Sequence, residues 1–193
     1  MVATGASSMW DTGRMSAVPP RAVALVQSRR AKLQALYEAH HEPVWRLLRR
    51  MGLDGARADD ATHQVFLVAL ERLDDIREGS ERSFLCGSAV RIARKEFSRN
   101  REDPVEDVPE VEAGSRPDDE LEDSRRRALL DSLLKRLTPD LREALVLHDF
   151  EGYTQVEMAQ MLDIPSGTAA SRLRRAREQF NTLLEEHLGR SKP

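Results

Sequence analysis

Residues 153–177 read YTQVEMAQMLDIPSGTAASRLRRAR, and this stretch decides the fold of the second half of the chain. Thr154 and Glu157 have the spacing of a capping box, in which the two side chains satisfy each other's free backbone amides, so a short helix is predicted to begin here. Residues 163–165 then turn the chain, and Ser166 is expected to cap a longer helix. A short helix, a tight turn and a basic helix are typical of a helix-turn-helix motif.

The longer helix of this motif is expected to run through at least Phe180 and to have two different faces. Ala169, Leu173 and Ala176 have the spacing of a buried stripe, and hydroxyl and guanidinium groups fill the rest of the surface. Arginine can bind guanine through two hydrogen bonds, and hydroxyls can reach phosphates or base edges, so the pattern predicts contact with a DNA major groove. A plain helical hairpin with a solvated arginine face is the alternative. The residues expected to contact DNA are Ser166, Thr168, Ser171, Arg172, Arg174 and Arg175.

Acidic residues are concentrated in the middle of the chain. Residues 102–123 hold 11 acidic residues against one arginine and also contain three prolines, so their composition cannot form a core. We predict an extended, acidic, flexible linker at this place. The net charge of −3 for the whole chain conceals a charge of +5 over residues 1–101 and +2 over residues 124–193. Local positive charge of this kind is what contact with phosphates requires.

The composition of the 193 residues indicates an all-α protein, because 33% are charged, only 5% are aromatic, and Leu, Ala, Arg and Glu are abundant. No apolar run approaches the roughly 20 residues of a membrane-spanning helix, so we expect no membrane insertion and a cytoplasmic location. The single cysteine, Cys86, cannot form an internal disulfide or a cysteine pair for zinc. The neighbouring His40 and His41 point about 100° apart on a helix, so a metal site is not expected there.

No pattern of an enzyme stands out. The sequence has no recognisable nucleophile and base pair and no glycine loop of the phosphate-binding type. We therefore expect no catalytic residues, no cofactor and no small-molecule substrate.

These observations predict two small helical domains joined by the acidic linker, with the helix-turn-helix in the second domain. The predicted divisions are a disordered tail over 1–27, a first domain over 28–101, the linker over 102–123, the second domain over 124–188, and a short tail over 189–193. In the first domain we expect two helices, or one helix broken at Pro43, and then a helix that Asp59 and Asp60 open. A further helix is expected to be capped by Ser80 or Ser83.

The helix that is expected to begin at Asp59 and end near Leu73 carries two stripes. Ala61, Val65 and Ala69 belong to an apolar stripe that suits burial. The second stripe repeats at spacings of three and four and is free either to meet a partner or to remain solvated. The second stripe consists of Asp60, His63, Gln64, Leu67 and Glu71.

Several short stretches resemble a known family in the order expected for two domains. In the second domain they are residues 137–139 (LTP), 142–145 (REAL), 152–154 (GYT), 157–159 (EMA) and 167–173 (GTAASRL). In the first domain residues 59–66 (DDATHQVF) are followed by Phe84-Leu85. Over roughly residues 30–188 the chain is similar to the extracytoplasmic-function (ECF) sigma factors of bacterial RNA polymerase.

The resemblance implies a sigma factor that binds core RNA polymerase and directs transcription from promoters. The second domain would bind the minus-35 element through the helix-turn-helix residues given above. The second stripe of the first domain would dock on a coiled coil of the largest polymerase subunit. An anti-sigma factor is a further partner that the resembled group usually has.

The resemblance also places recognition of the minus-10 element on the first domain. The loop around Arg77, Ser80 and Arg82 would hold a flipped base, and the helix that follows would bind the phosphates of the melted strand. The phosphate-binding residues of this helix would be Arg91, Arg94, Lys95 and Arg99.

Two other classes of function remain open at the level of the sequence. One is a stand-alone helix-turn-helix regulator that binds duplex DNA without polymerase, and the other is a helical adaptor that binds only proteins. A regulator would need a dimer seam or a ligand pocket in the first domain. The first domain presents the partner stripe and the basic surface more readily, which favours the sigma factor.

Overall fold

The computed structural model describes residues 20–102 and 118–190, and every regular element in these two ranges is a helix, as predicted. Residues 1–19 of the tail predicted over 1–27, residues 191–193 of the tail predicted over 189–193, and residues 103–117 of the predicted linker lie outside the described residues. The helices are α1 (Pro20–Arg50), α2 (Gly55–Glu71), α3 (Glu81–Glu102), α4 (Asp118–Lys135), α5 (Pro139–Leu145), the π-helical turn η1 (Val146–Phe150), α6 (Gln155–Leu162) and α7 (Ser166–Arg190).

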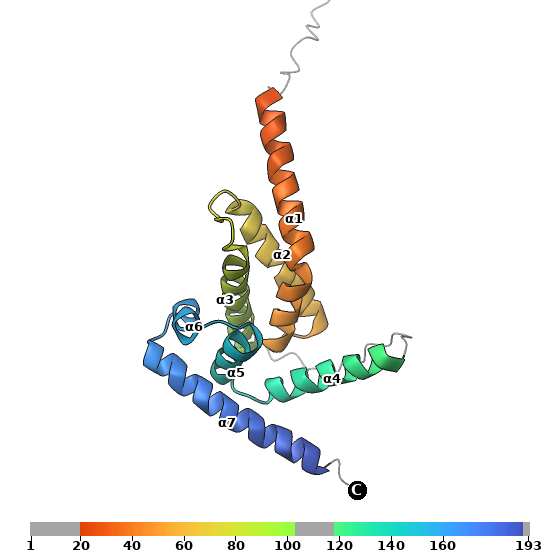
Figure 1. Ribbon diagram of the computed structural model, residues 1–193, viewed down its shortest axis with the longest axis vertical. Helices are drawn as coiled ribbons and strands as arrows, with labels where there is room; N and C mark the ends of the chain where they lie inside the picture. The colour runs from red at the N-terminus through yellow and green to blue at the C-terminus, as the bar shows by residue number, and fades with distance from the viewer. Residues whose placement is uncertain (1–19, 103–117, 191–193) are drawn as a thin grey trace, which may run out of the picture.

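The first domain is formed by α1, α2 and α3. Figure 1 shows α2 and α3 beside the lower half of α1, whose upper half projects beyond them. Leu47, Val65 and Leu85 come from the three helices and are fully buried at the centre of this domain. Burying apolar side chains of this size stabilises the fold by roughly 1.5–3 kcal/mol each.

Helix α1 is continuous through Pro43, where two helices or a break had been predicted. A proline inside a helix removes one backbone hydrogen bond and crowds the preceding turn. Leu36 on one side and Val44 and Leu47 on the other are all buried, so packing of the flanking turns holds the helix together. The helix also begins at Pro20, before the predicted start of the domain at residue 28.

The prediction that Asp59 and Asp60 open the second helix is wrong. Helix α2 begins at Gly55, and the side chain of Asp54 caps it by accepting a hydrogen bond of 2.8 Å from the backbone N–H of Arg57. Asp59 lies one turn further on, where its carboxylate accepts a 2.7 Å hydrogen bond from the indole N–H of Trp45. The earlier acid is therefore the cap, and the later one ties α2 to α1.

Ser80 directly precedes α3, which begins at Glu81, so the predicted position of this helix start is close to the observed one. The Ser80 hydroxyl, however, donates a 2.7 Å hydrogen bond to the carbonyl of Arg77 instead of accepting one from the helix. It thereby closes the loop between α2 and α3. Ser83, the other predicted cap, lies inside α3.

The helix-turn-helix is present in the second domain. Thr154 and Glu157 form the predicted capping box of α6, and α6 ends where Asp163 adopts a left-handed conformation with φ of 53°. Helix α7 begins at Ser166 itself, so this residue is the first of the helix instead of its cap. Ala169 and Leu173 are buried, as predicted.

Two boundaries in the second half of the chain differ from the prediction. Helix α4 begins at Asp118, inside the stretch predicted as linker, and α7 extends to Arg190, past the predicted domain end at residue 188. Within residues 20–102 and 118–190, no helix combines the length and the apolar character that crossing a bilayer requires.

The two domains pack against each other. In Figure 1, α5 lies below α3, α6 lies beside the lower end of α3, and α4 runs toward the lower end of α1 and ends near it. The buried guanidinium of Arg142 joins the domains, because it donates to the carbonyls of Leu134 and Leu137 in its own domain and to that of Met51 in the first, the last at 2.7 Å. Gly52 has a φ of 105°, and a Cβ at this position would lie 1.8 Å from a terminal nitrogen of Arg142. Only glycine fits here without moving the arginine.

Candidate nucleic-acid interface

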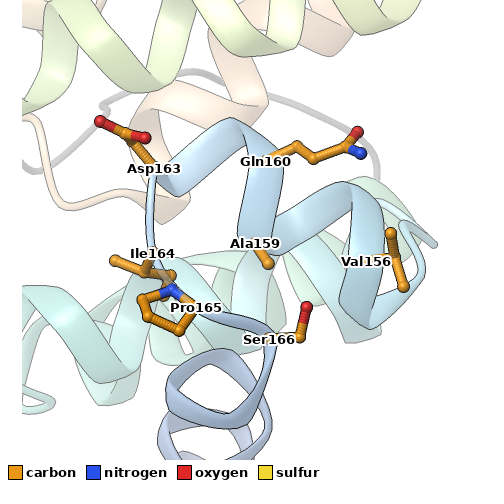
Figure 2. A pocket seen from close by; sticks show the side chains of 7 residues that line it. All are labelled: Val156, Ala159, Gln160, Asp163, Ile164, Pro165 and Ser166. Atoms are coloured by element: carbon orange, nitrogen blue, oxygen red, sulfur yellow. The ribbon is translucent and has the colours of Figure 1, made fainter.

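The turn of the helix-turn-helix forms a shallow pocket on the surface of the second domain. Figure 2 shows its lining, which α6, the turn and the first residue of α7 supply together. Ala159 is buried, and its small side chain allows α6 to approach α7 closely. Ile164 is half-buried and packs against the core, so it fixes the turn. The start of α7 is thus held at a defined angle on the surface.

All six residues predicted for major-groove contact lie in the first half of α7. Ser166, Arg174 and Arg175 are exposed, whereas Thr168, Ser171 and Arg172 are half-buried. Arg175 makes no ion pair with any described residue.

Neighbouring groups hold the other members of this set. The hydroxyl of Ser171 donates to the carbonyl of Thr168 at 2.9 Å. Arg172 pairs with Asp140 of α5 at 2.6 Å, and Arg174 pairs with Glu178 one turn later at 2.7 Å. Arg175 is therefore the guanidinium of this group that is most available to a ligand.

A further ion pair ties α7 to the π-helical turn η1. Arg177 donates to both carboxylate oxygens of Asp149, at 2.5 and 2.9 Å, and Nδ1 of His148 lies 2.8 Å from the same carboxylate. The hydrogen bond from Arg177 lowers the pKa of Asp149 from its ordinary value. Arg177 is exposed, but its guanidinium is already engaged.

The second stripe of α2 is exposed at all five predicted positions. Leu67 is 59% exposed, which is unusual for a large apolar side chain at the middle of a helix. Phe66, the residue before it, is buried, and its ring centroid lies 4.8 Å from that of Tyr37 on α1, which also packs against His41. The stripe therefore surrounds an accessible apolar centre with polar groups, as protein-binding surfaces do.

Side chains of α1 hold the loop between α2 and α3 in place. Lys32 donates to the carbonyl of Leu73 at 2.9 Å, and Arg29 forms an ion pair with Asp74. Arg77 on this loop is exposed, and Ser80 is half-buried. A ligand could thus reach the guanidinium of Arg77 on this loop.

The basic residues predicted for the minus-10 surface that lie on α3, Arg82 of the predicted loop among them, divide into two groups. Arg91, Lys95 and Arg99 are exposed along one side of the helix. Arg82 and Arg94 instead meet carboxylates of the second domain. The structure therefore does not bring all the predicted minus-10 residues onto one open surface.

Arg94 is bound closely by the second domain. It donates to both carboxylate oxygens of Glu143, at distances from 2.7 to 3.1 Å, and to the carbonyl of Leu162 at 3.0 Å. The hydrogen bond to Glu143 raises the pKa of Arg94. Glu143 is only 4% exposed, so this pair lies inside the interface.

Glu151 forms a second bridge between the domains. Arg82 donates to its carboxylate at 3.0 Å and to its backbone carbonyl at 2.7 Å, and Arg50 donates to the other carboxylate oxygen at 3.1 Å. Arg82 also lies over the ring of Tyr153, 5.2 Å from its centroid. Cys86 adjoins the same tyrosine, and burial raises the pKa of its thiol.

Sequence reasoning missed Glu143 and Glu151 as partners of the basic surface. Glu143 is followed by four buried apolar residues, 144–147. A charge within an apolar helix segment is a signal that a partner must be found elsewhere. Nothing local identifies that partner as Arg94.

The paired histidines at 40 and 41 lie on α1, and His41 stacks with the aromatic group around Tyr37. Among residues 20–102 and 118–190, no group of three or more His, Cys, Asp or Glu side chains is arranged to hold a metal ion.

Two solved structures share this fold. One is CnrH in complex with the cytosolic domain of CnrY, with a TM-score of 0.58 and 24% identity, covering 80% of this chain and 88% of that one. The other is the sigma factor RpoE in complex with the anti-sigma factor NepR from Bartonella quintana, with a TM-score of 0.52 and 23% identity, covering 84% of this chain and 97% of that one.

Family models and curated relatives agree with the arrangement of the two domains. Residues 36–102 match sigma-70 region 2, and residues 127–180 match sigma-70 region 4. RNA polymerase sigma factor CarQ of Myxococcus xanthus is 33% identical over 156 residues, which are 78% of this chain and 88% of CarQ. RNA polymerase sigma-H factor of Pseudomonas aeruginosa is 30% identical over 152 residues, covering 72% of this chain and 79% of that factor.

ECF RNA polymerase sigma factor SigE of Mycolicibacterium smegmatis is 29% identical over 157 residues, which are 79% of this chain but only 61% of SigE. The similarity thus extends over both domains and the segment between them. The chain belongs to the sigma factors of bacterial RNA polymerase, in their extracytoplasmic-function group.

Proposed function

We propose that this sigma factor binds its promoter with two surfaces, one on each domain, and docks on core RNA polymerase with a third. Its general function is to bind core polymerase and direct initiation at specific promoters. The observation that carries the proposal is the exposed, basic first half of α7 within a capped helix-turn-helix. This family function is favoured over that of a stand-alone regulator.

The proposed minus-35 surface is the first half of α7. Helix-turn-helix proteins place the N-terminal part of their second helix in the major groove. Ser166, Arg174 and Arg175 are exposed there, and Thr168, Ser171 and Arg172 lie beside them. In our proposal Arg175 makes the most direct contact, because no described residue competes for its guanidinium.

The proposed minus-10 surface consists of the loop before α3 and the basic side of α3. Arg77 and Ser80 would line the place of an unstacked base, with Arg82 at its edge. Arg91, Lys95 and Arg99 would follow the strand phosphates, since a row of cations on one helix suits a polyanion. Arg94 would join this row only after it leaves Glu143.

The proposed polymerase-docking surface is the exposed stripe of α2. Leu67 would insert its side chain into the partner, and the polar members Asp60, His63, Gln64 and Glu71 would surround it. An exposed leucine ringed by polar groups has the composition of an interface centre with its rim.

We further propose that the protein acts by binding alone, without bond chemistry of its own, and that it works in the cytoplasm with core polymerase. An anti-sigma factor is a proposed regulator. Support for it comes from a solved complex of similar fold, in which the sigma factor RpoE is bound to the anti-sigma factor NepR.

The test is run-off transcription with purified core polymerase on a library of genomic promoter fragments, with and without this protein. New start sites that depend on the protein are the expected result. DNA binding without polymerase association and without new starts would overturn the proposal and favour the stand-alone regulator. A variant with Leu67→Glu should lose the new starts while keeping its helical circular dichroism spectrum.

A further inference from the structure

The interface between the two domains contains cations that the proposed function assigns to DNA. Arg82 and Arg94 both belong to the proposed minus-10 surface, and both are paired with carboxylates of the second domain. Nε and Nη2 of Arg94 both donate to Glu143, and Nη2 of Arg82 donates to Glu151, so these donors are not available to a phosphate in this arrangement. The second domain therefore occupies part of the strand-binding surface.

The two carboxylates that form these bridges are paired with cations of the first domain. The ion pairs of Glu143 and Glu151 join them to Arg94, Arg82 and Arg50, all of which belong to α1 or α3. Glu143 is 4% exposed and Glu151 is 8% exposed. Burying a carboxylate is costly unless a cation and hydrogen bonds compensate it, so the ion pairs of the two glutamates stabilise the closed arrangement.

Other contacts reinforce this closed arrangement. Arg50 lies 5.1 Å from the centroid of Phe150, and Arg142 donates to the carbonyl of Met51. Asp131 of α4 lies 3.9 Å from Arg49 of α1. The contacts thus extend from α4 to α6, across the whole face that the second domain turns toward the first.

We infer that Glu143 and Glu151 form an acidic clasp, which occupies Arg94 and Arg82 as strand phosphates would and keeps the free chain from binding single-stranded DNA. The clasp must open before the minus-10 surface is complete. This inference rests on the proposed function for the identity of the strand, but the masking of the two arginines can be tested without polymerase.

The experiment compares the full chain with a Glu143→Gln and Glu151→Gln double variant. Small-angle X-ray scattering measures the radius of gyration, and fluorescence anisotropy measures the affinity for a labelled single-stranded thymidine oligonucleotide. Glutamine keeps the shape of glutamate but gives up the charge, so the closed state should weaken. We expect a larger radius of gyration and binding about tenfold tighter or more, because the apparent affinity scales with the open fraction.

A matched control removes the general effect of charge on DNA binding. The Glu185→Gln and Glu186→Gln double variant changes the net charge equally, but both residues are exposed on α7, and Glu186 pairs with Arg136 of its own domain. It should bind the oligonucleotide no more than about twofold tighter than the parent chain, since distant surface charges are screened.

Arg50→Gln provides a second variant with the opposite sign of charge. Arg50 holds Glu151 but is not part of the proposed DNA surface. Loss of a cation would ordinarily weaken DNA binding, whereas loss of the clasp should strengthen it. Tighter binding by Arg50→Gln therefore supports the clasp and cannot be attributed to charge.

The inference is overturned if the clasp variants keep the parent radius of gyration and affinity, or if they open without binding the oligonucleotide more tightly. Failure of the proposed function would look different. In that case the parent chain gives no new starts with core polymerase, while the clasp variants still open and bind the oligonucleotide.

Discussion

Thr154 and Glu157 show how two adjacent groups can set the orientation of a DNA-reading helix. The backbone N–H of Thr154 donates to the carboxylate of Glu157 at 2.8 Å, and the hydroxyl of Thr154 accepts from the backbone N–H of Glu157 at 3.3 Å. The backbone hydrogen bond lowers the pKa of Glu157. These bonds fix where α6 begins, and α6 in turn positions the start of α7.

Replacing Thr154 with alanine should therefore lower the free energy of unfolding by about 1 kcal/mol, as the loss of a helix cap usually does. Urea denaturation followed by circular dichroism measures this change. Thr182→Ala is the control, because Thr182 is an exposed threonine in the interior of α7. Equal effects of the two substitutions would contradict a special role of the cap.

The ion pair between Asp149 and Arg177 should make stability depend on pH in the acidic range. The pKa of Asp149 in the folded protein lies below its ordinary value of 3.8, so the unfolded chain takes up this proton first as the pH falls. The stability that the ionised carboxylate contributes is thus fully present above about pH 4 and is lost as the pH falls through the lowered pKa.

Thermal unfolding of the parent chain and of Asp149→Asn between neutral and acidic pH checks this prediction. The parent should be the more stable at neutral pH, and the difference should close below about pH 4. Asp75→Asn, at an exposed carboxylate of the loop between α2 and α3, controls for the loss of one negative charge. A difference that stays constant down to the lowest pH would refute the assignment.

At the scale of elements, the helices with local start signals were predicted best. The bounds of α6 follow from its capping box and from the turn at Asp163, and Thr138 and Pro139 mark the start of α5. The start of α2 was misplaced because Asp54 and Asp59 can both cap a helix. In the structure Asp54 caps α2, whereas the carboxylate of Asp59 accepts a hydrogen bond from Trp45 of α1. The continuity of α1 through Pro43 depends on tertiary packing, which no local pattern contains.

The recognition helix α7 makes the prediction for DNA binding specific. Arg175→Ala should weaken the binding of the polymerase complex to a promoter by about five- to hundredfold, the range for losing one good guanidinium contact with a base. An electrophoretic mobility assay with the polymerase complex and a mapped promoter measures this change. Arg125→Ala removes an exposed arginine of α4 and should have little effect. Unchanged binding by Arg175→Ala would remove this residue from the minus-35 surface.

At the scale of the whole molecule, the two domains and the position of the acidic segment could be predicted, but their contact could not. The concentration of acidic residues between two basic stretches identifies the boundary between the domains. The pairing of Arg94 with Glu143 joins residues far apart in sequence, so no local pattern predicts it. Two of the residues predicted for the strand surface are therefore engaged within the chain. The sequence identifies cations correctly but does not say which of them are free.

The docking of the whole molecule on polymerase should depend on Leu67. Leu67→Glu places a charge at the centre of the exposed stripe on α2 and should weaken binding to core polymerase by about tenfold or more, because interface centres tolerate charge poorly. Surface plasmon resonance with immobilised core polymerase measures the affinity. Leu188→Glu is the matched control, since Leu188 on α7 is 58% exposed and Leu67 is 59% exposed. Equal losses of affinity would place the docking surface elsewhere.

The position of Cys86 gives the chain a built-in chemical reporter. It is the single cysteine of the sequence, it is 5% exposed, and it adjoins Tyr153 of the opposite domain. Ellman's reagent, an aromatic disulfide, reacts only with an accessible thiolate and releases a coloured product. The rate at which the colour develops therefore reports the rate at which Cys86 becomes exposed as the domains separate. The reaction should be slow in the parent chain and markedly faster in the Glu143→Gln and Glu151→Gln variant. The motion between the domains can therefore be timed with a spectrophotometer and the unlabelled protein.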